Sequence, residues 1–184
     1  MMAGVHHLGL DGVLEITPKR FGDARGFFSE TYNFDEFSAA GIALNFVQDN
    51  HSYSAAKGVL RGLHYQLAPF AQDKLLRVLR GAIFDVAVDI RRSSPNFGKW
   101  VALEISAEKG NQIFVPKGFA HGFVTLTADV EVLYKVSDFY STEYDRAIRF
   151  DDADIGIDWP KIGDFQLSDK DLKAPLLRNA EVFE

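Results

Sequence analysis

Apolar and polar residues alternate with a period of two along most of the chain. This alternation is typical of β-strands with one buried face. It predicts strands at residues 13–17, 27–32, 44–48, 59–67, 75–79, 82–90, 100–105, 112–115, 123–127 and 130–136. The Arg80-Gly81 pair between two of these runs predicts a β-hairpin. Nine or ten short strands at this spacing favour an antiparallel sandwich or barrel over β-α-β units.

Helical patterns are short and few. Asn33 can cap a helix that ends before Gly41, since Asn is a preferred N-cap and Gly a preferred stop. The chain from Asp151 onward is rich in Asp, and we expect irregular structure there with a short helix starting near Ser168. No repeat or linker divides the chain, which predicts one domain over residues 1–184.

Composition narrows the functional classes. The chain has 184 residues and a net charge of −6, from 20 Lys and Arg against 26 Asp and Glu. This mild acidity gives no support to nucleic-acid binding. No run approaches the roughly 18 apolar residues of a membrane span. The absence of cysteine excludes disulfides, thiolate nucleophiles and Cys-ligated metals, and it fits a cytoplasmic protein.

Two glycine-anchored segments resemble the motifs of cupin barrels. Residues 110–121 follow the pattern G-x5-P-x-G-x2-H, which ends at His121. Residues 58–66 keep the Gly and first His of the other motif, at Gly58 and His64, but have Gln66 where the second His belongs. A catalytic metal usually needs three or more protein ligands. We therefore expect a double-stranded β-helix (jelly-roll) barrel with two imidazoles for proton chemistry and not for a metal.

Eight further signatures in order make the chain similar to the dTDP-4-dehydrorhamnose 3,5-epimerase family. They extend over nearly the whole chain: DARGFF at 23–28, QDN at 48–50, LRGLH at 60–64, KLLRV at 74–78, FDVAVDIR at 84–91, GFAHGF at 118–123, YKV at 134–136 and LSDKD at 167–171. The resemblance implies a homodimeric jelly roll without metal or cofactor. It also implies inversion of C3 and C5 of a 4-keto sugar attached to dTDP.

The resemblance also implies roles for individual residues. His64 is the expected general base, Asp171 its paired carboxylate, Tyr134 the general acid and Lys74 the cation beside the sugar ketone. Tyr140 is expected to stack on the thymine. The other expected substrate-binding residues are Arg25, Glu30, Gln48, Asp49, Asn50, Arg61, His121, Asp145 and Lys170. Asp145 departs from the Glu that many relatives have, and this shorter carboxylate would reach its partner through water.

These residue types suit proton transfer next to a ketone. A neutral imidazole can take the proton near pH 7, and a carboxylate on its other nitrogen fixes the tautomer. A cation stabilises the oxyanion at C4. A Tyr on the opposite face can return the proton with inversion.

Other functions remain open on the same barrel. They are a one-centre epimerase, a sugar ketoisomerase, a metal-dependent oxygenase and a sugar-binding protein without activity. One geometric condition also remains open. In a regular strand Arg61 and His64 point to opposite faces, so a shared site requires a bulge near Gly62 or a site that draws on two edges of the sheet.

Overall fold

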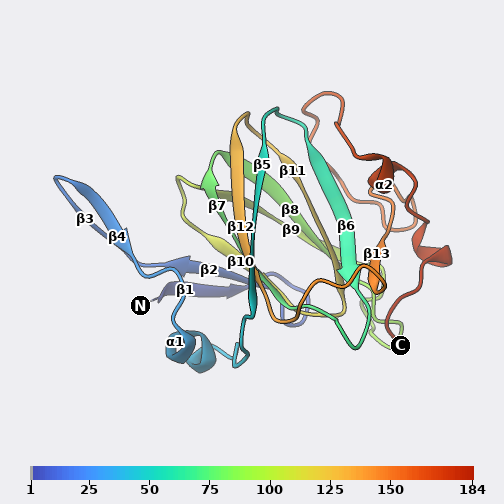
Figure 1. The fold of residues 1–184 in the computed structure, drawn as a ribbon, viewed down its shortest axis with the longest axis horizontal. Helices are drawn as coiled ribbons and strands as arrows, with labels where there is room; N and C mark the ends of the chain where they lie inside the picture. The colour runs from blue at the N-terminus through green and yellow to red at the C-terminus, as the bar shows by residue number, and fades with distance from the viewer. Residues whose placement is uncertain (1) are drawn as a thin grey trace.

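The computed structural model describes residues 2–184, in which two antiparallel sheets face each other (Figure 1). One sheet has the order β1 (Met2–His7), β2 (Leu14–Pro18), β10 (Gln112–Val115), β7 (Lys74–Arg80), β12 (Val130–Val136) and β5 (Gln48–Ser54). The other has the order β13 (Asp145–Ala147), β6 (Leu60–Gln66), β11 (Phe119–Thr125), β8 (Ala82–Asp89) and β9 (Trp100–Ser106). This is the cupin-like jelly roll that the sequence predicts.

The main core fills the space between the two sheets. Alternate residues of the strands point inward, and the buried cluster contains Ile83 and Ala87 from β8 together with Val130 and Val132 from β12. Full burial of a Val or Ile side chain such as these contributes about 1.5–3 kcal/mol. Tyr134 packs against the edge of this cluster, where the apolar core gives way to a polar cavity.

The predicted hairpin at Arg80-Gly81 is wrong. β7 pairs with β10 and β12, whereas β8 pairs with β9 and β11 in the opposite sheet. Gly81 alone connects the strands, with a φ of 76° that favours glycine. One residue is too short for a two-residue hairpin turn, and here it carries the chain from one sheet to the other. Lys74 and Asp85 therefore lie on opposite walls of the barrel.

A short helix and a two-stranded arm precede β5. In helix α1 (Phe34–Ala39), the Asn33 side chain accepts hydrogen bonds from the amides of Asp35 and Glu36, as expected of an N-cap. The arm consists of β3 (Arg20–Asp23) and β4 (Gly26–Ser29) and extends away from the two large sheets (Figure 1).

The C-terminal segment covers the outer face of the five-stranded sheet. Ile148, Ile155, Leu177 and Val182 form a second buried cluster with outward residues of β6 and β8. Only helix α2 (Asp169–Leu172) and a 3-10 turn (Leu177–Asn179) interrupt its irregular course. Within residues 2–184, no helix is long and apolar enough to cross a membrane.

Candidate active site

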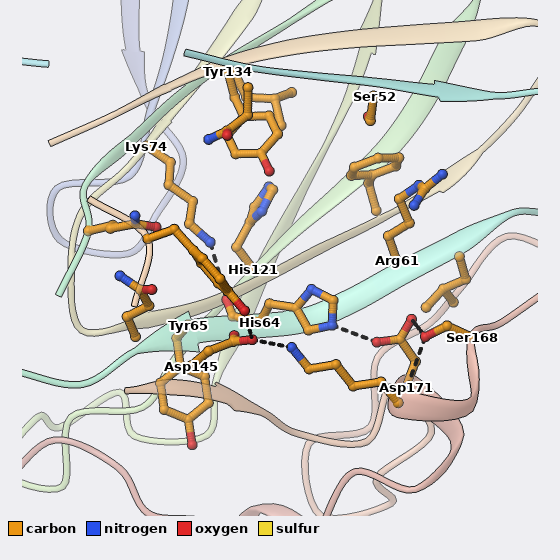
Figure 2. Close-up of a pocket in the computed structure, with 18 of the residues that line it drawn as sticks. Ser52, Arg61, His64, Tyr65, Lys74, His121, Tyr134, Asp145, Ser168 and Asp171 are labelled. Carbon is orange, nitrogen blue, oxygen red and sulfur yellow. Dashed lines mark hydrogen bonds and ion pairs between the residues drawn. The ribbon is translucent and has the colours of Figure 1, made fainter. Parts of the chain in front are cut away.

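A cavity of about 510 Å³ opens between the two sheets (Figure 2). Its walls come from β5, β6, β7, β11 and β12, and the C-terminal segment closes one side. Eleven of the residues expected at the site line it: Gln48, Asn50, Arg61, His64, Lys74, His121, Tyr134, Tyr140, Asp145, Lys170 and Asp171.

His64 and Asp171 form a hydrogen-bonded pair at the cavity wall. The distance from His64 Nε2 to Asp171 Oδ1 is 2.5 Å (Figure 2). Ser168, the N-cap of α2, donates its hydroxyl to Asp171 Oδ2 at 2.8 Å. Burial acts to raise the pKa of Asp171, but hydrogen bonds from His64 and Ser168 and nearby positive charge hold that pKa below its ordinary value. With the carboxylate on Nε2, Nδ1 is the ring nitrogen that can take up a proton.

A bulge in β6 brings Arg61 to the same cavity as His64. Along β11, His121 lies opposite His64, and Phe123, only two residues later, lies opposite Arg61. The extra residue opposite this step reverses the alternation of the strand. Gly62 makes the bulge possible, because its φ is 134° and a Cβ there would lie 2.5 Å from the Cα of Gly122. Of the two arrangements that the alternation left open, the structure has the bulge.

Lys74 and His121 lie deeper in the cavity. Lys74 Nζ donates to the backbone carbonyl of His64 at 3.3 Å (Figure 2). Burial lowers the pKa of Lys74 to about 8, although the carboxylates of Asp85 and Asp145 oppose this change. His121 Nε2 lies 3.0 and 2.9 Å from the two carboxylate oxygens of Asp85.

Tyr134 enters the cavity from the opposite wall. It lies on β12 of the six-stranded sheet, whereas His64 lies on β6 of the five-stranded sheet. Burial raises the pKa of Tyr134 above its ordinary value of 10, and the positive charge of Arg61 opposes this rise. The phenol therefore carries its proton at neutral pH.

A polar group forms the mouth of the cavity. Asp145 accepts hydrogen bonds from Lys170 and, at 3.1 Å, from the hydroxyl of Tyr140. The Tyr140 amide donates to Gln48 Oε1 at 3.2 Å, and the ring itself is 57% exposed. This places a flat aromatic surface beside a cation, an arrangement suited to a base attached to phosphate.

The structure does not bring three of the expected site residues to the cavity. Asp49 lies on the other face of β5 from Gln48 and Asn50, because neighbouring residues of a strand alternate, and it forms an ion pair with Lys135 at 2.9 Å. Arg25 is at the tip of the β3–β4 arm and pairs with Asp23 at 2.5 Å. Glu30 follows the same arm and is also outside the lining.

Some cavity residues were missed from sequence. Ser52 follows Asn50 at the next inward position of β5, and its buried hydroxyl has no hydrogen-bond partner within residues 2–184. The strand alternation could have identified it. Asp85 lies behind the cavity, and its pairing with His121 depends on two strands distant in sequence. No sequence pattern predicts that pairing.

The part of the chain that the structure describes contains no group of three His, Asp or Glu side chains arranged to hold a metal ion. Both cavity histidines instead bond single carboxylates. The cavity thus has an imidazole, a cation and a phenol in its walls, namely His64, Lys74 and Tyr134.

Comparisons with known proteins agree with this chemistry. The family model described as dTDP-4-dehydrorhamnose 3,5-epimerase matches residues 7–179. A dTDP-4-dehydrorhamnose 3,5-epimerase of Sinorhizobium fredii is 52% identical over 170 residues, which cover 92% of this chain and 87% of the relative.

Solved structures share the fold as well. A dTDP-6-deoxy-D-glucose-3,5-epimerase of Legionella pneumophila, in complex with dTDP-4-keto-L-rhamnose, has a TM-score of 0.93 and 46% identity, covering 97% of this chain and 94% of the other. A 3′-monoepimerase of Streptomyces bikiniensis, in complex with dTDP-quinovose, has a TM-score of 0.89 and 34% identity, covering 94% and 87%. With a family model that matches almost end to end and a relative of about half-identical sequence, this chain belongs to the dTDP-4-dehydrorhamnose 3,5-epimerase family.

Proposed function

We propose that this protein is a dTDP-4-dehydrorhamnose 3,5-epimerase, an isomerase that converts dTDP-4-dehydro-6-deoxy-D-glucose to dTDP-4-dehydro-L-rhamnose. The observation that carries the proposal is the position of His64 and Tyr134 on opposite walls of one cavity, with Lys74 beside them. Inversion at a carbon next to a ketone needs this arrangement, because the proton must leave from one face and return to the other.

The first half of the reaction removes a proton from C3 or C5. His64 takes it on Nδ1, and Asp171 on Nε2 stabilises the imidazolium that forms. The electron pair moves to the C4 oxygen, which becomes an enolate. The ammonium of Lys74 stabilises that oxyanion, and a preorganised charge in a water-poor cavity is effective for this purpose.

The second half returns a proton from the opposite side. Tyr134 gives its hydroxyl proton to the carbon, and the enolate returns to a ketone with inverted configuration. Because burial raises the pKa of the phenol, a nearby positive charge is needed to stabilise the transient phenolate. Arg61, which lines the same cavity and lowers this pKa, can supply it.

The remaining cavity residues suit the nucleotide. Arg61 and Lys170 offset the diphosphate charge, and the exposed ring of Tyr140 stacks on the thymine. Charge-assisted hydrogen bonds to phosphate are the strongest that such a site can offer. The Legionella relative, solved with dTDP-4-keto-L-rhamnose, supports this class of substrate.

The proposal includes a homodimer in which the arm of one chain completes the site of the other. Arg25 and Glu30 lie outside the cavity of their own chain, so they can serve as substrate ligands only in a second copy. The arm also exposes three phenylalanines, Phe21, Phe27 and Phe28, by 46%, 63% and 69%. Such apolar exposure on an extended arm is typical of a surface that a partner covers. The proposal also places the enzyme in the cytoplasm, which the lack of cysteine supports.

Proton NMR of dTDP-4-keto-6-deoxyglucose in D2O with the purified protein tests this function. The double epimerase exchanges and inverts both C3 and C5. Exchange at one carbon alone indicates the alternative, a one-centre epimerase, an activity named for the Streptomyces bikiniensis protein of the same fold. No exchange at either carbon would contradict both.

A further inference from the structure

Asp85 is a fully buried carboxylate behind the cavity. It lies on β8 with 0% exposure and is absent from the cavity lining. Its neighbours on the same face of the strand, Ile83 and Ala87, belong to the apolar core. Both of its oxygens accept from His121 Nε2, at 3.0 and 2.9 Å. The carboxylate therefore fixes the hydrogen of the imidazole on Nε2 and holds the ring in place.

A negative charge in an apolar core is unfavourable unless positive groups balance it. Burial raises the pKa of Asp85, and two cavity residues, His121 and Lys74, oppose this rise. The dependence is mutual. Burial lowers the pKa of Lys74 to about 8, and Asp85 is the strongest of the charges that act against this.

The other charges near Lys74 largely compensate one another. Asp145 favours the ammonium and Lys170 disfavours it, and these two residues form an ion pair. His64 contributes its backbone carbonyl, which accepts from Lys74 Nζ. Tyr134, on the neighbouring strand β12 of the same sheet, is neutral below its raised pKa. The effect of Asp145 on Lys74 is thus offset by Lys170 at the cavity mouth, whereas the effect of Asp85 is not offset by a cation there.

We propose that Asp85 is a positioning residue for proton transfer: its carboxylate orients His121 and keeps Lys74 an ammonium beside the sugar ketone. This inference rests on the proposed function, in which Lys74 stabilises the oxyanion at C4. Without the charge on Asp85, Lys74 loses its proton at a lower pH. The neutral amine cannot stabilise the oxyanion, so turnover falls while the nucleotide still binds.

Asp85→Asn tests the inference through the pH profile of kcat. The alkaline limb, near pH 8 in the parent, is expected to move down by about one pH unit, as loss of a nearby opposite charge requires. The ratio of turnover at pH 8 to turnover at pH 6 should then be about fivefold lower in the variant than in the parent. The dissociation constant of dTDP stays within about twofold, because Asp85 does not line the cavity. Asp85→Glu, which keeps the charge, should retain the parent limb.

Asp89→Asn is the matched control. Asp89 lies on the same strand, is also 0% exposed, and pairs with Arg91 at 2.6 Å away from the cavity. This variant loses a buried charge and stability but should keep the alkaline limb of the parent. If Asp85→Asn and Asp89→Asn gave the same pH profile, Asp85 would have only a structural role and the inference would be wrong.

A measurement on the unmutated protein covers the case in which Asp85→Asn does not fold. Carbon-13 NMR of the Asp85 carboxyl group should show it ionised at pH 7. A protonated Asp85 at that pH has no charge to hold Lys74 and overturns the inference. This result is independent of turnover, whereas a parent protein that exchanges neither C3 nor C5 would contradict the proposed function.

Discussion

His64 and His121 lie directly opposite each other on β6 and β11, yet each imidazole bonds a different carboxylate. Asp171 at the start of α2 pairs with His64, and Asp85 inside the barrel pairs with His121. Their accessibility differs: the side chain of His64 is 33% exposed and that of His121 only 8%. Two similar pairs are therefore suited to different tasks, His64 to contact with the reacting carbon and His121 to a fixed place in the wall.

The first prediction follows from this difference. His64→Ala removes the accessible base, so exchange of both the C3 and C5 protons in D2O should fall to background. The dissociation constant of dTDP should stay within about threefold, because the nucleotide contacts remain. His51→Ala is the control, since His51 is an exposed imidazole on β5 that pairs with Glu131 outside the cavity. Retained exchange at either carbon in His64→Ala would exclude His64 as the common base.

The second prediction concerns Asp171. Asp171→Asn keeps the shape of the pair but loses the negative charge that stabilises the imidazolium. Replacement of the carboxylate in a catalytic histidine–aspartate pair by an amide costs up to about 10⁴-fold, so kcat should fall by as much as that factor and by less than in His64→Ala. Comparison of single-turnover rates for the two variants checks the order. A loss in Asp171→Asn equal to that in His64→Ala would mean that the charge is as essential as the base.

The third prediction tests the exchange of arms between subunits. Arg25→Ala should raise the dissociation constant of dTDP about tenfold, as expected for one charge-assisted phosphate contact. An Arg25→Ala chain supplies an intact cavity and a His64→Ala chain supplies an intact arm. Half of the dimers in an equal mixture are mixed, and each of these has one complete site of two. With substrate well below the parent KM, where Arg25→Ala dimers are weakly active, the mixture should recover about one quarter of the parent activity. If mixing after unfolding and refolding gave no recovery, the arm would not serve a second copy.

The fourth prediction uses the pKa of Lys74. Because this pKa is lowered to about 8, the ammonium is lost as the pH rises through that value, and kcat should fall on the alkaline side. Lys74→Arg keeps a charge at all accessible pH values, since the guanidinium pKa stays above about 12. Its turnover should be lower because the group is larger, but the alkaline limb near pH 8 should disappear. If the alkaline limb of Lys74→Arg stayed near pH 8, the titration of a group other than Lys74 would cause it.

Local chemistry made much of the fold predictable. The runs at 112–115 and 130–136 coincide with β10 and β12, and Asn33 caps α1 as expected. The strand expected at 44–48 instead begins at Gln48 and continues to Ser54, and β1, β3 and β13 were not predicted. Pairing in a sheet depends on partners far away in sequence, which local alternation does not contain. The prediction of a hairpin at Arg80-Gly81 was wrong for the same reason.

The same distinction between local pattern and distant partners applies to the site residues. Alternation along β5 separates Gln48 and Asn50 from Asp49, and this could have been seen in the sequence. The bulge that unites Arg61 with His64 depends on the approach of Gly62 to Gly122 across two strands. Arg25 lies on the arm outside the cavity, and its proposed role in the site of a second chain is not encoded in local alternation. The family resemblance thus implied which side chains form the site, whereas their relative geometry required the folded barrel.

The last prediction concerns Tyr134. This residue also packs against the apolar core, so its ring could serve packing alone. In that case Tyr134→Phe should leave turnover within a few-fold of the parent, because the ring shape is kept. Tyr144→Phe is the control, since Tyr144 packs against Phe70 and does not line the cavity.

If Tyr134 is the acid, the variant should separate two processes that the parent couples. His64 still removes the C3 and C5 protons from its own wall, and it can return a deuteron only to the face from which the proton left. Positioned acid catalysis contributes about 10²–10⁴-fold, so formation of the inverted product should fall by at least two orders of magnitude. Deuterium should still enter the substrate with retained configuration. The ratio of exchange to inversion, measured by NMR in D2O, therefore decides the role of the hydroxyl. Inversion of both centres at near-parent rate would exclude Tyr134 as the donor and would direct the search to Tyr140, a phenol with an exposed ring at the cavity mouth.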